Sequence, residues 1–297
     1  MPAGEVRQPS IRLAPAALKN MWMFSPFHLV GHEYSSDESY FTDAVCWGPR
    51  SCTNLIRMSI ENMNERREVL LIRHGQSTAN EGGVWQGQLE FPLSDKGRLQ
   101  ASYSGRALRG SGVSGVYASP LSRAFETAEI VACESGFSGE VVPMPGLIER
   151  SGGVLEGLSW AEQEARNHVF VKKFLSLPEE ERWALAGAET DEDILIRFKE
   201  ALSDILSRHP AVDGPIIVVS HGGVMRAFLR HVFGPGILSG NKRAPNASIT
   251  RLLYGPQGSD TLPRLLELAS TDHLPPEITT SPEAPGSTAD TTTGRQE

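Results

Sequence analysis

The hydrophobic pattern between residues 63 and 270 alternates between two kinds of segment. Short runs of adjacent apolar residues are typical of strands buried on both faces, and they occupy 69–72, 115–119 and 216–219, with a late strand over 248–254. The segments between them carry apolar residues at helical spacing. This alternation predicts a three-layer α/β/α sandwich with a mostly parallel central sheet, formed as one domain over 63–270.

Four helices are expected from the spacing, over 94–109, 121–133, 190–210 and 222–233. Ser94 is predicted to cap the first of them, and its buried face is expected to carry Leu99, Tyr103 and Ala107. Thr190 with Asp193 three residues later resembles a capping box for the third helix. The two caps therefore predict the residues at which the first and third helices begin.

The two ends of the chain have a different composition. Residues 1–62 show no sustained helical or strand period, so we expect either an unstructured extension or a mis-annotated start, with translation beginning at Met63 or Met58. Residues 271–297 hold five carboxylates against one arginine, and 15 of these 27 residues are Ser, Thr, Pro or Gly. Such a segment has little apolar surface to bury, so it is predicted to be a disordered acidic tail.

Composition and charge narrow the class of protein. The 297 residues carry a formal net charge of −8, with 39% hydrophobic and 22% charged residues, which is ordinary for a globular protein. The acidic balance argues against a nucleic-acid binder, and no run is long and apolar enough for a membrane partner. Three cysteines without a CxxC pair favour a cytoplasmic location. His28, His32 and Glu33 have ligand-like spacing but no evident further ligand, so no metal site is expected.

Two of the predicted strands end in a histidine followed by glycine. Residues 69–72 lead into Arg73-His74-Gly75, and residues 216–219 lead into Ser220-His221-Gly222. Ligands bind beyond the carboxyl ends of strands in open α/β sheets, so both histidines are expected at a ligand site. The helix that starts near Gly222 would also direct backbone N–H groups at an anion.

The third strand supplies another cation to the same edge. Arg123 follows strand 115–119 and falls in the first turn of the next helix, where the positive end of the helix dipole disfavours it. An anion between the dipole and the guanidinium would offset that cost. Arginine also binds phosphate oxygens with a planar, two-pronged fork. The pattern therefore predicts that two arginines and two histidines converge on an anionic group.

The motifs that carry these residues resemble the histidine phosphatase superfamily, which includes the cofactor-dependent phosphoglycerate mutases. The resemblance begins with RHGQSTAN at 73–80, SPLSRAFETA at 119–128 and SHGG at 220–223. Other segments follow in the family's order: WQGQLEFPLSDKGRLQA at 85–101, GLIER at 146–150, GLSW at 157–160, GAETDEDILIR at 187–197 and NASITRL at 246–252. The ordered set covers nearly all of 63–254 and implies a phosphoglycerate mutase-like fold.

The resemblance implies a role for each matching residue. His74 matches the nucleophile that carries the phosphoryl group, and Glu149 matches the acid that protonates the leaving oxygen, with Glu156 as a nearby alternative. The residues that match phosphate-binding positions are Arg73, Asn80, Gln86, Arg123, His221 and Gly222. Asn80 and Gln86 could instead cap loops. No metal and no cofactor is implied, because arginine and histidine supply the positive charge.

Departures from the mutase pattern favour hydrolysis. The mutase branch has ERxYGxLxGxxK after its acid, whereas this chain reads ERSGGVLEGLSW from Glu149, with Gly153 in the tyrosine position. The expected activity is therefore a phosphomonoester hydrolase with a phosphohistidine intermediate. Its expected partner is a small phosphorylated substrate such as a sugar phosphate, phosphoglycerate or glycosyl-phosphoglycerate. A phosphoglycerate mutase and a non-catalytic phosphate-binding protein remain alternatives, and the oligomeric state is left open.

Residues outside these motifs are given other roles. The variable stretch between Trp160 and Gly187 is expected to form a lid, and its candidates for substrate choice are Glu162, Gln163, Phe170, Lys172, Lys173 and Trp183. Four further polar residues are expected to be solvated or to serve packing, namely His168, His209, His231 and Arg226. Cys133 is expected to be a buried small apolar residue.

Overall fold

The computed structural model describes residues 66–209, 214–239, 243–256 and 262–280. All of them belong to the larger of two compact units, Pro49–Glu297. The other unit, Met1–Gly48, lies outside the described residues, as does the expected extension over 1–62 with its His28, His32 and Glu33.

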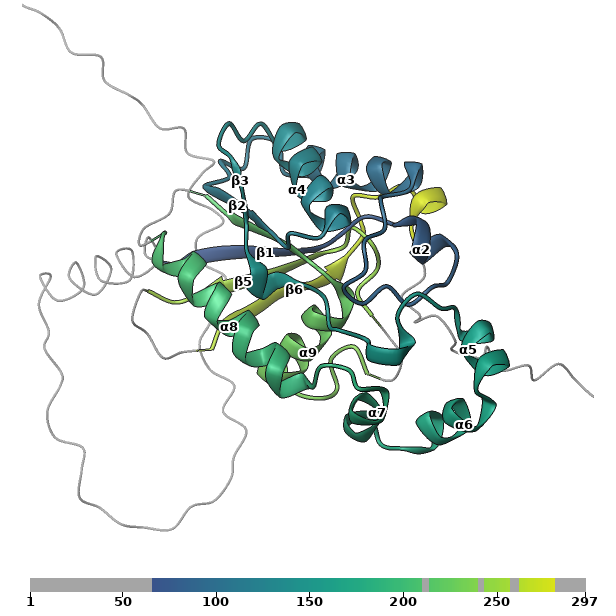
Figure 1. Ribbon diagram of the computed structural model, residues 1–297. Coiled ribbons are helices and arrows are strands. Elements are labelled where there is room, and N and C mark those ends of the chain that lie inside the picture. The colour runs from purple at the N-terminus through teal and green to yellow at the C-terminus, as the bar shows by residue number, and fades with distance from the viewer. Residues whose placement is uncertain (1–65, 210–213, 240–242, 257–261, 281–297) are drawn as a thin grey trace, which may run out of the picture. The chain divides into compact units, whose positions relative to one another are not determined.

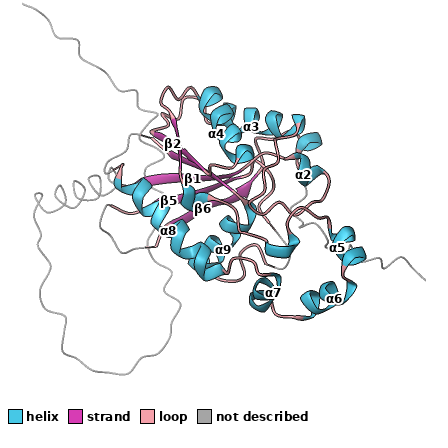
Figure 2. Ribbon diagram, viewed as in Figure 1, coloured by secondary structure: helices cyan, strands magenta, loops and turns pink. Residues whose placement is uncertain are grey.

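A six-stranded sheet in the order β3-β2-β4-β1-β5-β6 forms the centre of the larger unit (Figure 2). The predicted strands are present as β1 (Arg67–Arg73), β2 (Gly115–Ala118), β4 (Ile216–Ser220) and β5 (Ile249–Tyr254). The edge strands β3 (Val141–Pro143) and β6 (Arg264–Ser270) were not expected. The first four strands in the order pair in parallel and β5 and β6 pair antiparallel, so the predicted mostly parallel sheet is confirmed.

Strand β1 shows how the sheet divides the core into two layers. Val69 and Leu71 pack on one face, in the apolar cluster that includes helices α8 (Asp191–Ser207) and α9 (Gly222–Phe233). Leu70 and Ile72 pack on the opposite face, in the cluster that includes α3 (Asp95–Ala107) and α4 (Ser122–Ser135). Figure 1 shows these helix pairs on opposite sides of the sheet, which confirms the three-layer sandwich.

The helix caps that the sequence indicated are present. Ser94 accepts a hydrogen bond from the backbone N–H of Gly97 at the start of α3, and Thr190 with Asp193 forms a reciprocal capping box on α8. The remaining short helical segments are α2 (Thr78–Glu81), α5 (Trp160–Arg166), α6 (His168–Ser176), α7 (Glu179–Ala186), η2 (Pro145–Leu147), η3 (Gly153–Leu155) and η4 (Pro276–Ile278).

Two predictions about buried helix faces are wrong. Leu99 is 53% exposed, because α3 turns its small residues toward α4; a Cβ at Gly105 would lie 2.6 Å from the side chain of Glu134. Such close approach of two helices excludes a leucine from the contact. Cys133 is exposed, because the buried stripe of α4 runs through residues 128, 131, 132 and 135.

The C-terminal segment is ordered further than its composition suggested. Residues 271–280 of the expected tail pack against the domain, with Leu274 buried. Gln100 Nε2 on α3 donates to the backbone oxygen of Ile278 at 2.6 Å. A few well-placed contacts therefore order a segment rich in proline and threonine, while residues 281–297 lie outside the description.

Helices α5, α6 and α7 form a separate small layer with its own apolar cluster, beside the end of the sheet (Figure 1). The buried members of this cluster are Leu155, Phe174, Trp183 and Ala186. Among the described helices, none combines the length and apolar character required to cross a membrane.

Candidate active site

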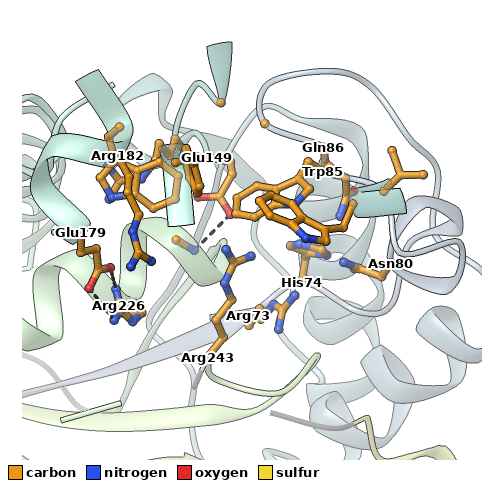
Figure 3. A pocket seen from close by; sticks show the side chains of 18 of the residues that line it. Arg73, His74, Asn80, Trp85, Gln86, Glu149, Glu179, Arg182, Arg226 and Arg243 are labelled. Carbon is orange, nitrogen blue, oxygen red and sulfur yellow. Dashed lines mark hydrogen bonds and ion pairs between the residues drawn. The ribbon is translucent and has the colours of Figure 1, made fainter. Parts of the chain in front are cut away.

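A pocket of about 350 Å³ brings the predicted site residues together (Figure 3). Most of those residues line it, namely Arg73, His74, Asn80, Gln86, Arg123 and Glu149. They come from the ends of strands and the loops that follow, which is where open α/β sheets bind ligands. The volume is in the range of pockets that hold small molecules.

His74 directly follows β1 and has one ring nitrogen already engaged. Its Nδ1 lies 2.7 Å from the carbonyl oxygen of Gly75, and because a carbonyl only accepts, Nδ1 carries the proton. Nε2 therefore keeps its lone pair. Burial, followed by the charges of Arg123 and Arg73, holds the pKa of His74 well below its usual value. The ring is neutral at physiological pH, as a nitrogen nucleophile must be.

Arg73 and Arg123 are buried cations whose hydrogen bonds go only to neutral acceptors. Arg73 Nη1 donates to the backbone oxygen of Ala244 at 2.6 Å, and Arg123 donates to the backbone oxygens of Leu89 and Gly87, each at 2.8 Å. Within the described part of the chain, neither forms an ion pair and the Nε of each has no acceptor. Burial, and then Arg243, lowers the pKa of Arg73 to about 10, so it stays charged at pH 7.

His221 lies next to His74 but outside the pocket wall. The two ring centroids are 5.0 Å apart, and His221 Nε2 is 2.8 Å from Ser119 Oγ. Burial, then Arg123, His74 and Arg73, holds the pKa of His221 well below its usual value. Its Nδ1 is buried with no hydrogen-bond partner in the described residues. Gly222 also lies outside the wall, and a Cβ there would come 3.2 Å from Arg73 Nε.

Ser77 organises Asn80 and Gln86. Asn80 Oδ1 accepts from the Ser77 backbone N–H at 3.2 Å and from Asn246 Nδ2 at 3.1 Å. Gln86 Oε1 accepts from Ser77 Oγ at 2.7 Å. Both amide oxygens are thus engaged in holding loops. Asn80 Nδ2 and Gln86 Nε2 remain as the donors that could serve a molecule in the pocket. The capping and ligand-binding interpretations therefore apply to different atoms of the same side chains.

Glu149 sits at the start of helix α9. Its two carboxylate oxygens accept from the backbone N–H groups of Gly223 and Val224, each at 3.1 Å, and of Arg150 at 2.8 Å. We expected the N–H groups at this helix start to point at a bound anion. For Gly223 and Val224 this prediction is wrong, because the carboxylate of Glu149 accepts both N–H groups. Glu156 lies outside the pocket wall and fastens loops, with Oε1 accepting from Gly152 N–H at 2.6 Å.

The lid side of the pocket contains residues that the sequence did not indicate. Arg226 was expected to be solvated or to serve packing, but it lines the pocket and forms an ion pair with Glu179 (Figure 3). Arg150, Arg182 and Arg243 line it as well. Arg150 ends the GLIER motif and Arg243 lies just before NASITRL, so the motifs could have pointed to both, whereas Arg182 lies in the variable insertion and had no such signal.

Of the lid candidates for substrate choice, Trp183 lines the pocket. Gln163 is buried and donates through Nε2 to the backbone oxygen of Val154 at 2.8 Å, and Phe170 packs on Phe174 with ring centroids 5.8 Å apart. Lys172 and Lys173 are exposed. In the described residues, no group of three or more His, Cys, Asp or Glu side chains is placed to hold a metal ion.

Known proteins share these motifs and this fold. The chain is 35% identical over 165 residues to the metal-independent phosphoserine phosphatase of Arabidopsis thaliana. The matched region is 55% of this chain and 68% of that protein. The chain is 29% identical over 167 residues to the glucosyl-3-phosphoglycerate phosphatase of Mycobacterium tuberculosis, covering 54% and 73%. A solved mycobacterial glucosyl-3-phosphoglycerate phosphatase in complex with VO3 superposes with a TM-score of 0.59 at 26% identity, covering 69% of this chain and 100% of that one.

A family-level match spans most of the domain. The profile of the histidine phosphatase superfamily (branch 1) matches residues 69–264, which is more than half of the chain. The expected family and fold are confirmed, and so is the assignment to the phosphatase class of enzymes. The chain belongs to the histidine phosphatase superfamily, branch 1.

Proposed function

We propose that this protein hydrolyses a small phosphomonoester of the phosphoserine, sugar phosphate or phosphoglycerate type, through a phosphohistidine on His74. The substrate class draws on the relatives, which are named for phosphoserine and glucosyl-3-phosphoglycerate. The three sparse cysteines favour the cytoplasm as its location.

The first half of the reaction transfers the phosphoryl group. His74 Nε2 attacks phosphorus, a P–N bond forms, and the P–O bond to the leaving group breaks. Glu149 gives a proton to the leaving oxygen, so that a neutral alcohol departs. Arg73 and Arg123 stabilise the negative charge on the phosphoryl oxygens, with the donors of Asn80 and Gln86 beside them.

The second half returns the enzyme to its starting state. Glu149, now deprotonated, takes a proton from a water molecule whose oxygen attacks phosphorus. The P–N bond breaks and its electron pair returns to His74 Nε2, which releases inorganic phosphate. Nδ1 keeps its proton throughout, because Gly75 O holds it.

The observation that carries this proposal is the state of the two arginines beside the neutral His74. Arg73 and Arg123 give their hydrogen bonds to backbone carbonyl oxygens, so no carboxylate within the described residues is hydrogen-bonded to either cation. Buried N–H groups are normally satisfied in folded proteins. The Nε donors of Arg73 and Arg123, which have no acceptor in the described residues, therefore favour an anionic ligand.

The test is phosphate release from a panel of phosphomonoesters by the full chain, with and without His74→Asn. We expect the substitution to lower turnover by at least about 10³-fold and to abolish acid-labile labelling of the protein by phosphate. His168→Asn is the matched control, because that ring is exposed on α6, and it should retain turnover. Near-normal turnover by His74→Asn would exclude the mechanism.

The same panel separates the alternatives. A mutase would interconvert 2- and 3-phosphoglycerate and would need a bisphosphoglycerate primer to do so. A non-catalytic protein would bind phosphomonoesters and release no phosphate from any of them. Either result would replace the proposal.

A further inference from the structure

Arg243 is held at the pocket by the catalytic segment itself. The backbone oxygen of its neighbour Ala244 accepts from Arg73 Nη1 at 2.6 Å. Three residues after Arg243, Asn246 Nδ2 donates to the backbone oxygen of His74 at 3.1 Å. The side chain of Arg73 and the backbone oxygen of His74 thus fix the segment that carries Arg243, and the pocket wall includes its side chain (Figure 3).

The guanidinium of Arg243 is oriented but not neutralised. Its Cζ lies 4.9 Å from the centroid of the Trp85 ring, an arrangement that stacks the cation and leaves the N–H edge available. No carboxylate or carbonyl oxygen of the described residues hydrogen-bonds to it. Its pKa is lowered mainly by burial, with Glu149 opposing that shift.

Two other arginines of the pocket differ in this respect. Arg226 is paired with Glu179, and Arg150 with Asp191, so each has a carboxylate partner within the chain. Arg150 also stacks on an indole, with its Cζ 4.4 Å from the Trp183 centroid. Arg243 has the same kind of stacking without the internal partner. The missing acceptor is what a substrate would provide.

We propose that Arg243 recognises a carboxylate on the organic part of the substrate, so that the enzyme prefers phosphomonoesters of carboxylic acids. This inference rests on the proposed function and names its substrate class. One planar guanidinium fork matches the two oxygens of one carboxylate in both geometry and charge. A second phosphate, with a charge near −2, would call for two free cations, and Arg182, the other lid-side arginine without a carboxylate partner in the described residues, already donates to the backbone oxygens of Leu177 and Leu175.

The experiment compares substrates that differ only in the carboxylate. O-phosphoserine is paired with O-phosphoethanolamine, and 3-phosphoglycerate with glycerol 3-phosphate. We expect the full chain to have the higher kcat/KM for the acid of each pair. Arg243→Met should raise KM for the acids by roughly 10- to 100-fold and leave KM for the two partners within about twofold.

Two further variants keep the test independent of folding. Arg243→Lys keeps the charge without the fork, and should give an intermediate KM for the acids alone. Arg182→Met removes another pocket arginine, whose Nε donates to the Leu177 backbone oxygen. It should leave unchanged the ratio of kcat/KM for each acid to kcat/KM for the matching substrate without a carboxylate. An equal effect of Arg182→Met and Arg243→Met on that ratio would mean that any positive charge in the pocket favours the acids, and it would overturn the inference.

The two proposals fail in different ways. If the wild-type chain hydrolyses acids and partners with the same kcat/KM, the role of Arg243 is wrong and the phosphatase proposal stands. If Arg243→Met lowers activity on all four substrates equally, the residue does not read the carboxylate. If the wild-type chain releases no phosphate from any substrate, the proposed function itself is wrong.

Discussion

At the scale of single residues, the site depends on two histidines that are kept neutral by their surroundings. Burial and the nearby arginines lower the pKa of both His74 and His221. His74 has the tautomer that leaves Nε2 available, set by the Gly75 carbonyl. The same burial that keeps both rings neutral also connects the stability of the fold to pH.

Stability should fall as the pH drops below 6.5. In the unfolded chain both histidines take up a proton near pH 6.5, whereas in the folded chain they do so only at much lower pH, so acid favours unfolding. Each histidine should cost about 1 kcal/mol of unfolding free energy between pH 6.5 and 5.5. Urea unfolding at the two pH values measures this loss. His221→Asn should show a smaller loss than wild type, and equal losses would contradict the prediction.

Ser77 should act as a positioning residue. Its Oγ donates to Gln86 Oε1 at 2.7 Å and accepts from the Asn80 backbone N–H at 3.1 Å. Ser77→Ala should lower kcat/KM about tenfold and cost about 1 kcal/mol of stability. Steady-state kinetics and urea unfolding measure the two effects. Ser94→Ala removes another helix-capping serine outside the pocket wall, so it should cost similar stability but preserve kcat/KM.

The sequence could predict many of the residues that line the pocket, because several follow strands whose apolar runs are easy to recognise. His74 and Arg123 come from such positions, and the structure brings them to one pocket. Arg243 and Arg226 could not be found this way. Arg226 lies within a helix, and Arg243 lies in a loop whose position depends on hydrogen bonds to distant residues.

At the scale of elements, one carboxylate links helix α7 to helix α9. Glu179 on α7 forms ion pairs with Arg226 and Arg230 on α9. Burial alone would raise the pKa of Glu179, but hydrogen bonds from the two arginines outweigh it and lower the pKa to about 2. The usual pKa of a glutamate is about 4.5. Above that pH the Glu179 carboxylate is fully charged, so its ion pairs with Arg226 and Arg230 are at full strength.

Removing this attachment should loosen the lid without unfolding the domain. Glu179→Gln is expected to speed backbone amide exchange in α6 and α7 about tenfold, because a charge-assisted link between α7 and α9 is lost. Hydrogen-exchange mass spectrometry resolves those segments from the sheet. Glu181→Gln, an exposed position on the same helix, should leave exchange unchanged. Equal exchange in both variants would mean that the aromatic cluster alone holds the lid.

Element types were easier to predict than faces and edges. Buried strands such as β4 carry unbroken apolar runs, and helix α8 has a capping box at its start. The edge strands β3 and β6 were missed because their residues are partly exposed and lack such runs. The buried face of α3 was misassigned because close packing on α4, rather than hydrophobicity, decides which residues point inward.

At the scale of the whole molecule, the C-terminal segment is connected to the pocket through Asn246. Thr280 Oγ1 accepts from the Asn246 backbone N–H at 3.0 Å and lies 3.3 Å from Asn246 Oδ1. Asn246 in turn holds the backbone oxygen of His74. A segment that composition alone assigned to a disordered tail therefore contributes to the position of His74.

Truncation at two points should separate these contributions. A chain ending at residue 270 loses the burial of Leu274 and the partner of Gln100, and should be less stable by at least about 2 kcal/mol, with a lower kcat/KM. A chain ending at residue 280 keeps every described contact and should match the full chain in both measurements. Urea unfolding and steady-state kinetics check this, and a fully active, stable 1–270 chain would refute it.

The position of β1 between β4 and β5 has a consequence for how the protein is made. Val69 pairs with Ile216 and Leu252, so both partners of this strand come from the second half of the chain. At typical ribosomal rates, β4 emerges on the order of 10 s after β1. During that interval four adjacent apolar residues, all nearly inaccessible in the finished fold, have no neighbouring strand. The strand that leads to His74 is thus the first of the sheet to be made and is paired only late, and slower translation of the second half would lengthen its exposure to aggregation.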